Sequence, residues 1–272
     1  VECVLKTVSI DGREIPVCDI ILHLKTAGGY FGATPSYQNE NQTLDVALNV
    51  PAPVQKANNA YGYTLKGAVI VLDAGHDPVK DPGAVGVLKD NETGEYLFPE
   101  HILNAAVRDQ MAAILKELGA TVITVDNAKM IYAAQRLPYF QSKQPHMMIN
   151  IHHNSSTDAS ATGPVCCYFN SYSQLLGKYL LHSVGNPYIN GKTYPTKAPY
   201  FYPFQMNREP YYPSVTFECG FISNAVEHEL LAMPENQKKI AQQMVRGLLE
   251  YFVQTGSLNH AGLAVSSSSQ SR

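Results

Sequence analysis

The stretch AVIVLDAGHD, Ala68 to Asp77, decides the fold of this chain. Its run of apolar and β-branched residues, Val69 to Leu72, predicts a strand buried on both faces, and Gly75 ends that strand abruptly. His76 then follows the carboxyl end of the strand. Ligands of open α/β sheets bind at that end, so a histidine here is a candidate functional residue.

Two later segments repeat this arrangement of a buried strand followed by chemically able side chains. Met147 to Ile151 runs directly into His152 and His153, and Ser214 to Phe217 runs into Glu218. The carboxyl ends of parallel strands lie at one edge of a sheet. We therefore expect these strand ends to face one another around a metal ion.

From residue 67 onward, predicted strands alternate with predicted helices, which favours an α/β fold with a mostly parallel sheet covered on both sides. Pro99 suits the first position of a helix that ends near Gly119, a second helix is expected over residues 128–143, and a last one begins at Pro234. We expect a catalytic domain over residues 67–255. The serine-rich tail, residues 256–272, is expected to be disordered.

Residues 1–66 have a different pattern, with short strands expected at Cys3 to Ile10, Ile15 to Lys25 and Leu44 to Val50. Asp11-Gly12 is typical of a hairpin turn, and residues 28–43 are expected to link two strands. We interpret this part as a small β-rich element of unknown role. A structural cap and a binding module both remain open for it.

Composition excludes several functional classes. The 272 residues carry a net charge of −3, with 16% charged residues, so electrostatics favours neither nucleic acid nor an anionic membrane as partner. No apolar run approaches the roughly 20 residues that span a bilayer. The chain begins at Val1 without an initiator methionine, which suggests a mature or trimmed form.

The five cysteines form no CxxC pair, which argues against a structural zinc ribbon. Cys166, Cys167 and Cys219 are expected to be buried free thiols. Cys3 and Cys18 flank the predicted hairpin, so a disulfide between them is open.

The sequence lacks the HExxH, GxSxG, GxxxxGK[ST] and GxGxxG motifs of other enzyme classes. A hydrolytic zinc site needs about three imidazole or carboxylate ligands and an open position for water. Glu100 is the best carboxylate to join the histidines, because the helix dipole after Pro99 favours its ionised form. Glu92 and Glu95 compete with it, and spacing alone favours an ordinary acidic residue placed for helix stability.

Glu218 follows an apparently buried strand, where an unpaired charge is costly. A glutamate next to a zinc site can accept the proton of water and pass it to a leaving amine. An ion pair with Arg208 is an equally good interpretation from the residues alone.

Five motifs, in order, resemble the zinc-dependent N-acetylmuramoyl-L-alanine amidases of the Amidase_3 type. They are DAGHD with DPGAVG (73–86), Glu100 with HILNAAV, NIHHN (150–154), GPVCCYF (163–169) and PSVTFECGFISN (213–224). The resemblance implies a twisted mixed sheet flanked by helices and one catalytic Zn²⁺ ion. Position by position, it assigns His76, Glu100 and His152 as ligands and Glu218 as the catalytic carboxylate. His153 stands where the family usually has a small residue, and it is left to a supporting or substrate-binding role.

The resemblance implies a secreted or cell-wall hydrolase that acts on peptidoglycan, cleaving the amide between N-acetylmuramic acid and the L-alanine of the stem peptide. Asn154 or a backbone amide near Gly220 is a candidate for holding the oxyanion. The tyrosine- and proline-rich segment Pro187 to Pro213 is a candidate wall of the substrate groove. The alternatives are a zinc peptidase or deacetylase acting on another amide, and a wall-binding module without catalysis. No partner protein or oligomeric state is implied.

Overall fold

The computed structural model describes residues 2–21, 23, 33–38, 40, 43–48, 51–130, 132–194, 198–209 and 211–260. Six of the described strands form one sheet in the order β11-β10-β12-β9-β7-β8. Their bounds are β7 Val69–Ala74, β8 Thr121–Ile123, β9 Met147–Asn154, β10 Val165–Tyr168, β11 Tyr200–Phe201 and β12 Ser214–Phe221. Within this sheet β10 and β12 are antiparallel and the other neighbours are parallel, which confirms the mixed, mostly parallel sheet.

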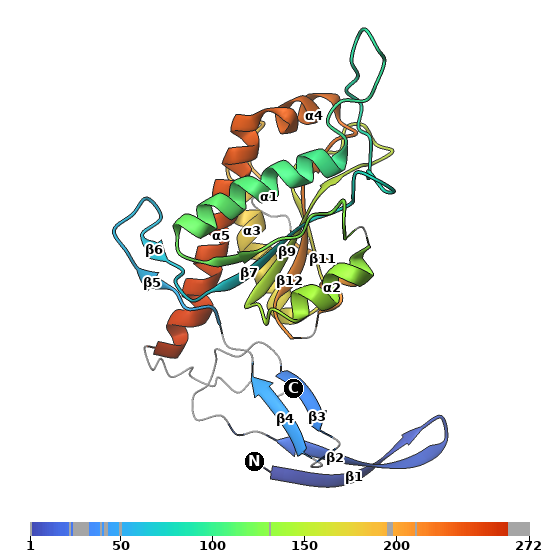
Figure 1. Ribbon diagram of the computed structural model, residues 1–272, viewed down its shortest axis with the longest axis vertical. Helices are drawn as coiled ribbons and strands as arrows, with labels where there is room; N and C mark the ends of the chain where they lie inside the picture. The colour runs from blue at the N-terminus through green and yellow to red at the C-terminus, as the bar shows by residue number, and fades with distance from the viewer. Residues whose placement is uncertain are drawn as a thin grey trace.

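Helices cover both faces of this sheet (Figure 1). The larger layer, with α1, α3 and α5, packs on one face, and α2 packs with a short 3₁₀ helix, η1, on the other. The helix bounds are α1 Glu100–Glu117, α2 Ala133–Gln141, α3 Ser171–Val184, η1 Gln205–Arg208, α4 Ala225–Ala232 and α5 Pro234–His260. The predicted α/β fold is therefore confirmed.

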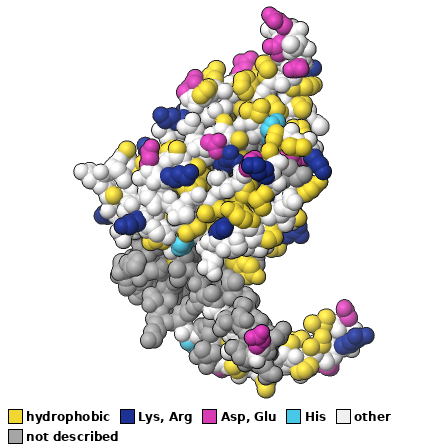
Figure 2. All heavy atoms as spheres, viewed as in Figure 1, with side chains coloured by type: hydrophobic (Ala, Val, Ile, Leu, Met, Phe, Trp, Pro, Cys, Tyr) yellow, Lys and Arg dark blue, Asp and Glu magenta, His cyan; other side chains and the backbone are white. Residues whose placement is uncertain are grey.

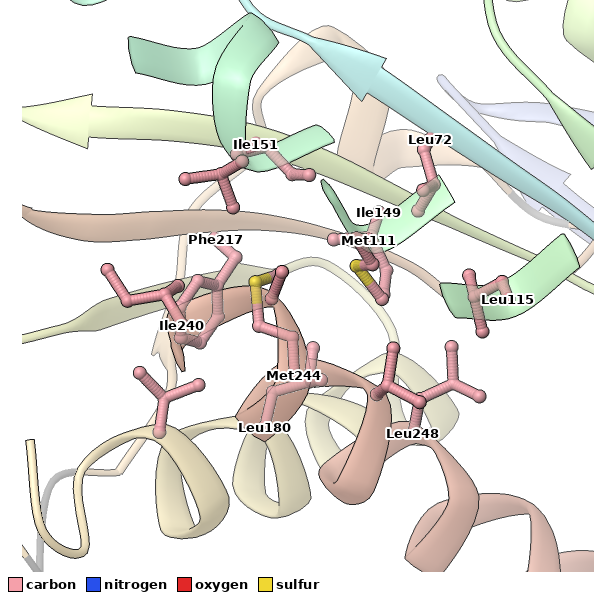
Figure 3. Packing of buried hydrophobic residues seen from close by; sticks show 14 of the residues in the cluster. Leu72, Met111, Leu115, Ile149, Ile151, Leu180, Phe217, Ile240, Met244 and Leu248 are labelled. Carbon is pink, nitrogen blue, oxygen red and sulfur yellow. The ribbon is translucent and has the colours of Figure 1, made fainter. Parts of the chain in front are cut away.

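The larger core lies between the sheet and the layer of α1, α3 and α5 (Figure 3). Alternate residues of a strand point to opposite faces, so every second residue of β7, β9 and β12 enters this core. Members from those strands and from the three helices include Leu72, Ile149, Phe217, Met111, Leu180 and Met244. Each large apolar side chain buried there stabilises the fold by about 1.5–3 kcal/mol.

A smaller core lies on the opposite face of the sheet. It contains Val71 of β7 and Met148 of β9, which pack with Phe140 of α2 and Met206 of η1. Val71 and Met148 are next in sequence to residues that face the larger core. This apolar cluster holds α2 and η1 on the face that also carries the polar residues described below.

Some boundaries differ from the sequence prediction. Helix α2 begins at Ala133 rather than near Ala128, because Asp126 forms a turn in which its side chain accepts from the Ala128 N–H at 3.1 Å and its carbonyl from Lys129. Residues 28–43, expected as a link, contain the strand β3 Ala33–Gln38. Helix α5 continues to His260. Residues 261–272 lie outside the described residues, so the expected disorder of the tail stays a prediction.

The N-terminal strands pair with one another. Strands β1 Glu2–Ile10 and β2 Arg13–Ile21 form the predicted hairpin, with positive φ at Asp11 and Gly12, as a type I′ turn requires. Strand β3 Ala33–Gln38 pairs with β4 Thr43–Leu48, and β5 Gln55–Lys56 with β6 Tyr63–Thr64.

All five cysteines are free thiols. Cys166, Cys167 and Cys219 are buried, which confirms the expectation for them. Cys3 and Cys18 are exposed on the β1–β2 hairpin, where they lie opposite Ile20 and Leu5.

The surface has no dominant charge on the side that Figure 2 shows. Acidic side chains of the described residues gather towards the top of this view and basic ones lie mostly across the middle, without a continuous patch of either sign. Among the described helices, none has the length and apolarity to cross a bilayer.

Candidate metal centre

The predicted residues meet at the carboxyl edge of the sheet, although β9 and β12 do not end before His152 and Glu218 but continue to Asn154 and Phe221. Strands β7, β9 and β12 run parallel, and Glu218 lies opposite His152 in the register of β12 and β9. The N–H of Gly75 donates to the carbonyl of Ile151 at 2.8 Å, which holds the segment after β7 against β9. This pairing carries His76 to the same edge of the sheet.

Glu100 lies between the two histidines. The Nε2 atom of His76 is 3.1 Å from Oε2 of Glu100, and Nδ1 of His152 is 2.8 Å from Oε1. The three potential ligand atoms lie within 4.8 Å of one another. His76, Glu100 and His152 therefore form one compact cluster, as expected.

Helix α1 places the Glu100 carboxylate. Pro99 precedes the helix, and Glu100 occupies its first position, where the dipole favours a negative charge. The backbone N–H groups of Ala84 and His153 donate to its carboxylate at 3.0 and 3.3 Å. The competing Glu92 and Glu95 are exposed in the preceding loop, so they are not part of the cluster.

His76 and Glu100 shift one another's pKa values, and each partner favours the charged form of the other. Burial raises the pKa of Glu100, but hydrogen bonds from His152 and His76 lower it more, and the net shift is downward. Burial lowers the pKa of His76, but the carboxylates of Glu100 and Asp81 outweigh this and raise it to about 9. The cluster thus stabilises positive charge beside an ionised carboxylate.

Glu218 lies in the same cleft in a different environment. Its side chain is buried, and its Oε2 atom has no hydrogen-bond partner among the described residues. Burial raises the pKa of Glu218 to about 7, opposed by His152 and reinforced by the charge of Glu100. The alternative partner, Arg208, is exposed on η1, and no ion pair joins it to Glu218 among the described residues.

Comparison with known proteins places this cluster in a family. The family model Amidase_3, N-acetylmuramoyl-L-alanine amidase, matches residues 70–250, which include both histidines and both glutamates. The chain belongs to this amidase family. The amidase is therefore a hydrolase of the amide between N-acetylmuramic acid and L-alanine, in a zinc-dependent family that acts on peptidoglycan.

Relatives of known sequence and structure agree with this family assignment. The germination-specific N-acetylmuramoyl-L-alanine amidase of Bacillus subtilis is 27% identical over 209 residues, which cover 71% of this amidase and 83% of the relative. The catalytic domain of CwlV, an amidase from Bacillus (Paenibacillus) polymyxa var. colistinus, superposes with a TM-score of 0.58 at 27% identity, over 69% of this chain and 99% of that one. CwlD from Clostridioides difficile, solved with the GerS lipoprotein, shares the fold at 22% identity, with a TM-score of 0.54 over 69% of this chain and 99% of CwlD.

The donor set of the amidase fits a metal ion. Two imidazoles and one carboxylate are the ligand types that catalytic zinc sites use. One histidine nitrogen lies 2.8 or 3.1 Å from each oxygen of the Glu100 carboxylate, so an ion bound among these atoms would balance its charge. Such a His-Glu-His cluster is consistent with the zinc site of the family.

The two neighbouring histidines point in opposite directions. His152 faces the cleft, whereas His153 is buried on the α1 side, where its Nδ1 lies 2.7 Å from Oδ1 of Asn104. Burial lowers the pKa of His153 to about 3, so its imidazole is neutral. Because neighbouring residues of a strand face opposite ways, His152 joins the cluster and His153 does not.

Three supporting residues were not expected from the sequence. Asn104, four residues after Glu100 on α1, donates to the carbonyl of Gly75 at 3.0 Å. Asn127 and Arg136 donate to the carbonyl of His76 at 2.9 and 3.3 Å and hold its backbone, which has a φ of +66°. Only Asn104 carried a sequence signal, because i and i+4 residues share a helix face.

The cleft of the amidase has a volume of about 530 Å³. Asn154 lines it, together with Phe204 and Gln205 of the tyrosine- and proline-rich segment. Gly220, the other suggested oxyanion position, is not among its lining residues and packs near Tyr188 and Glu227.

Proposed function

We propose that the amidase binds one Zn²⁺ ion through His76, Glu100 and His152 and that Glu218 is its catalytic proton carrier. The observation that carries this proposal is the convergence of the three ligand atoms within 4.8 Å, beside a buried carboxylate. These residues come from four separate segments of the chain. A shared ion explains why they meet.

A bound zinc ion supplies Lewis acidity, which polarises an amide carbonyl and lets water act as a nucleophile near neutral pH. Glu218 accepts the proton that this water loses and delivers it to the amine of L-alanine as the C–N bond breaks. We assign Asn154, which lines the cleft, as a hydrogen-bond donor to the carbonyl oxygen of the substrate.

The environment of Glu218 suits both halves of this proton transfer. A pKa near 7 lets a carboxyl group accept and release a proton at physiological pH. A dication in the neighbouring cluster would stabilise the carboxylate and lower this value, which favours the ionised form before the reaction begins.

We also infer that the amidase acts outside the cytoplasm, in the cell wall. The inference rests on its substrate, because peptidoglycan lies there, and on a probable cell wall amidase of Staphylococcus epidermidis that is 27% identical over 207 residues. That match covers 75% of this chain and 64% of the relative.

The test combines metal analysis with product analysis. Purified protein should contain one zinc ion per chain, and sacculi treated with it should gain free L-alanine amino termini while the glycan strands stay intact. Loss of both after chelation, and recovery with zinc, is the expected result. New termini at another residue would favour a zinc peptidase, released acetate a deacetylase, and zinc-free protein that binds sacculi without cleavage a wall-binding module.

A further inference from the structure

Strand β11 forms an outer edge of the sheet, and its two residues and the next one form a run of exposed aromatic side chains. Tyr200, Phe201 and Tyr202 are 59%, 61% and 52% exposed. Large exposed apolar surfaces are uncommon on soluble domains and mark places where another molecule binds.

The strand register places Tyr200 on the face of the sheet that forms the cleft. Asn150 of β9 lies opposite Thr216 of β12, Thr216 opposite Cys167 of β10, and Cys167 opposite Tyr200. Residues opposite one another in neighbouring strands share a face. Asn150 and Thr216 line the cleft, so Tyr200 continues the same face to the edge of the sheet.

Aromatic rings connect this edge to the cleft. The ring centroids of Tyr202 and Phe204 are 4.3 Å apart, and Phe204 lines the cleft. On the opposite side, Phe201 stacks on Phe169 with centroids 5.6 Å apart, which supports the strand from behind. We call Tyr200, Tyr202 and Phe204 the aromatic edge.

We propose that the aromatic edge binds the glycan strand of peptidoglycan beyond the sugar that is cleaved from its peptide. The proposal rests on the proposed function, because it extends the same substrate along the same face. Sugar rings present apolar C–H faces bordered by hydroxyl groups, and tyrosine offers a matching apolar ring with a polar tip. A polymer also needs binding surface outside a cleft of about 530 Å³.

The first experiment measures binding without turnover. Full-length protein carrying Glu218→Gln is titrated with peptide-free glycan strands, with and without the double change Tyr200→Ala and Tyr202→Ala. Loss of two stacking rings should raise Kd about tenfold. Tyr96→Ala is the matched control, because Tyr96 is 47% exposed and lines no cleft described above.

Equal affinity of the double variant and its parent for glycan strands would overturn the proposal. A loss of binding to free stem peptides, with glycan binding intact, would also overturn it and assign the edge to the peptide. Circular dichroism and thermal unfolding establish that the variant is folded.

The second experiment separates this proposal from the proposed function. In protein that retains Glu218, the double variant should raise KM for sacculi about tenfold while kcat falls much less. The loss should be smaller on a single muropeptide, whose sugars are too few to reach the edge. If wild-type protein cleaves neither substrate, the proposed function fails, and glycan binding still decides the role of the aromatic edge.

Discussion

Two glutamates that line the same cleft have opposite pKa shifts. Hydrogen bonds from His76 and His152 lower the pKa of Glu100, whereas burial raises that of Glu218 to about 7. Environments that separate the pKa values of two carboxyl groups give them different roles. Glu100 is suited to bind an ion, and Glu218 is suited to exchange protons.

Replacing Glu218 by Gln removes the proton acceptor while keeping the size of the side chain. We expect turnover of sacculi to fall at least about 100-fold, because general acid–base catalysis contributes that much or more. The zinc content should be unchanged. Glu92→Gln, in an exposed loop, is the control and should retain full activity. Wild-type turnover by the Glu218 variant would remove this residue from the mechanism.

Gly75 allows the close approach of His152. A Cβ atom at residue 75 would overlap the His152 imidazole, so Gly75→Ala must displace that ring. We predict at least about a tenfold weaker zinc affinity, the range seen when residues that orient metal ligands are changed. Competition with a fluorescent chelator measures it. Glu92→Gln, in an exposed loop outside the cluster, serves as the control. An unchanged zinc affinity of the Gly75→Ala variant would show that zinc binding does not depend on the position of the His152 ring.

At the scale of elements, the loop between β7 and α1 is anchored by His228 of α4. Its Nδ1 accepts from the N–H groups of Val87 and Leu88 at 3.1 and 3.3 Å. Its Nε2 therefore carries the proton and donates to the carbonyl of Phe98 at 3.0 Å. A neutral imidazole thus fixes the chain just before Glu100.

This anchor makes stability depend on pH. Burial lowers the pKa of His228, although the Phe98 carbonyl opposes this, so the unfolded chain binds the proton first. The contribution of His228 to the free energy of unfolding should therefore fall as pH drops below about 6.5, the ordinary histidine value. His153 and His146, also with lowered pKa values, act in the same direction.

Urea unfolding between about pH 5 and 8 measures this dependence. Replacing His228 by Gln should flatten the slope below about pH 6.5 and lower stability at neutral pH, because part of the loop anchor is lost. An unchanged slope in the variant would mean that His228 does not carry the effect.

The sequence predicted helices and strands well where apolar residues form continuous runs or recur at helical spacing. The existence of β7, β9 and β12 follows from their unbroken apolar runs, but the ends of β9 and β12 do not, because these strands continue to Asn154 and Phe221. The start of α2 could not be read in the same way, since the Asp126 turn depends on side-chain hydrogen bonds. Asn127 and Arg136 were missed because their partner is a backbone carbonyl distant in sequence, which no local pattern encodes.

At the scale of the whole molecule, the expected boundary at residue 67 can be tested by truncation. Ala52 and Leu65 are 2% and 0% exposed in the main core, and the N–H of Leu65 donates to the Leu118 carbonyl at 2.7 Å. We predict that a chain starting at residue 51 retains its melting temperature. Starting at residue 67 should cost about 2–5 kcal/mol, as for other large losses from a core. Equal stability of the two chains would place the boundary at residue 67.

The proposed catalysis depends on His76, Glu100 and His152 sharing one zinc ion. Anomalous diffraction at the zinc absorption edge, from crystals of the zinc-loaded protein, tests this directly. We predict one strong peak coordinated by these three side chains, with Glu218 beside it. A peak bound by other residues, or no peak while the two imidazoles point into separate regions, would contradict it.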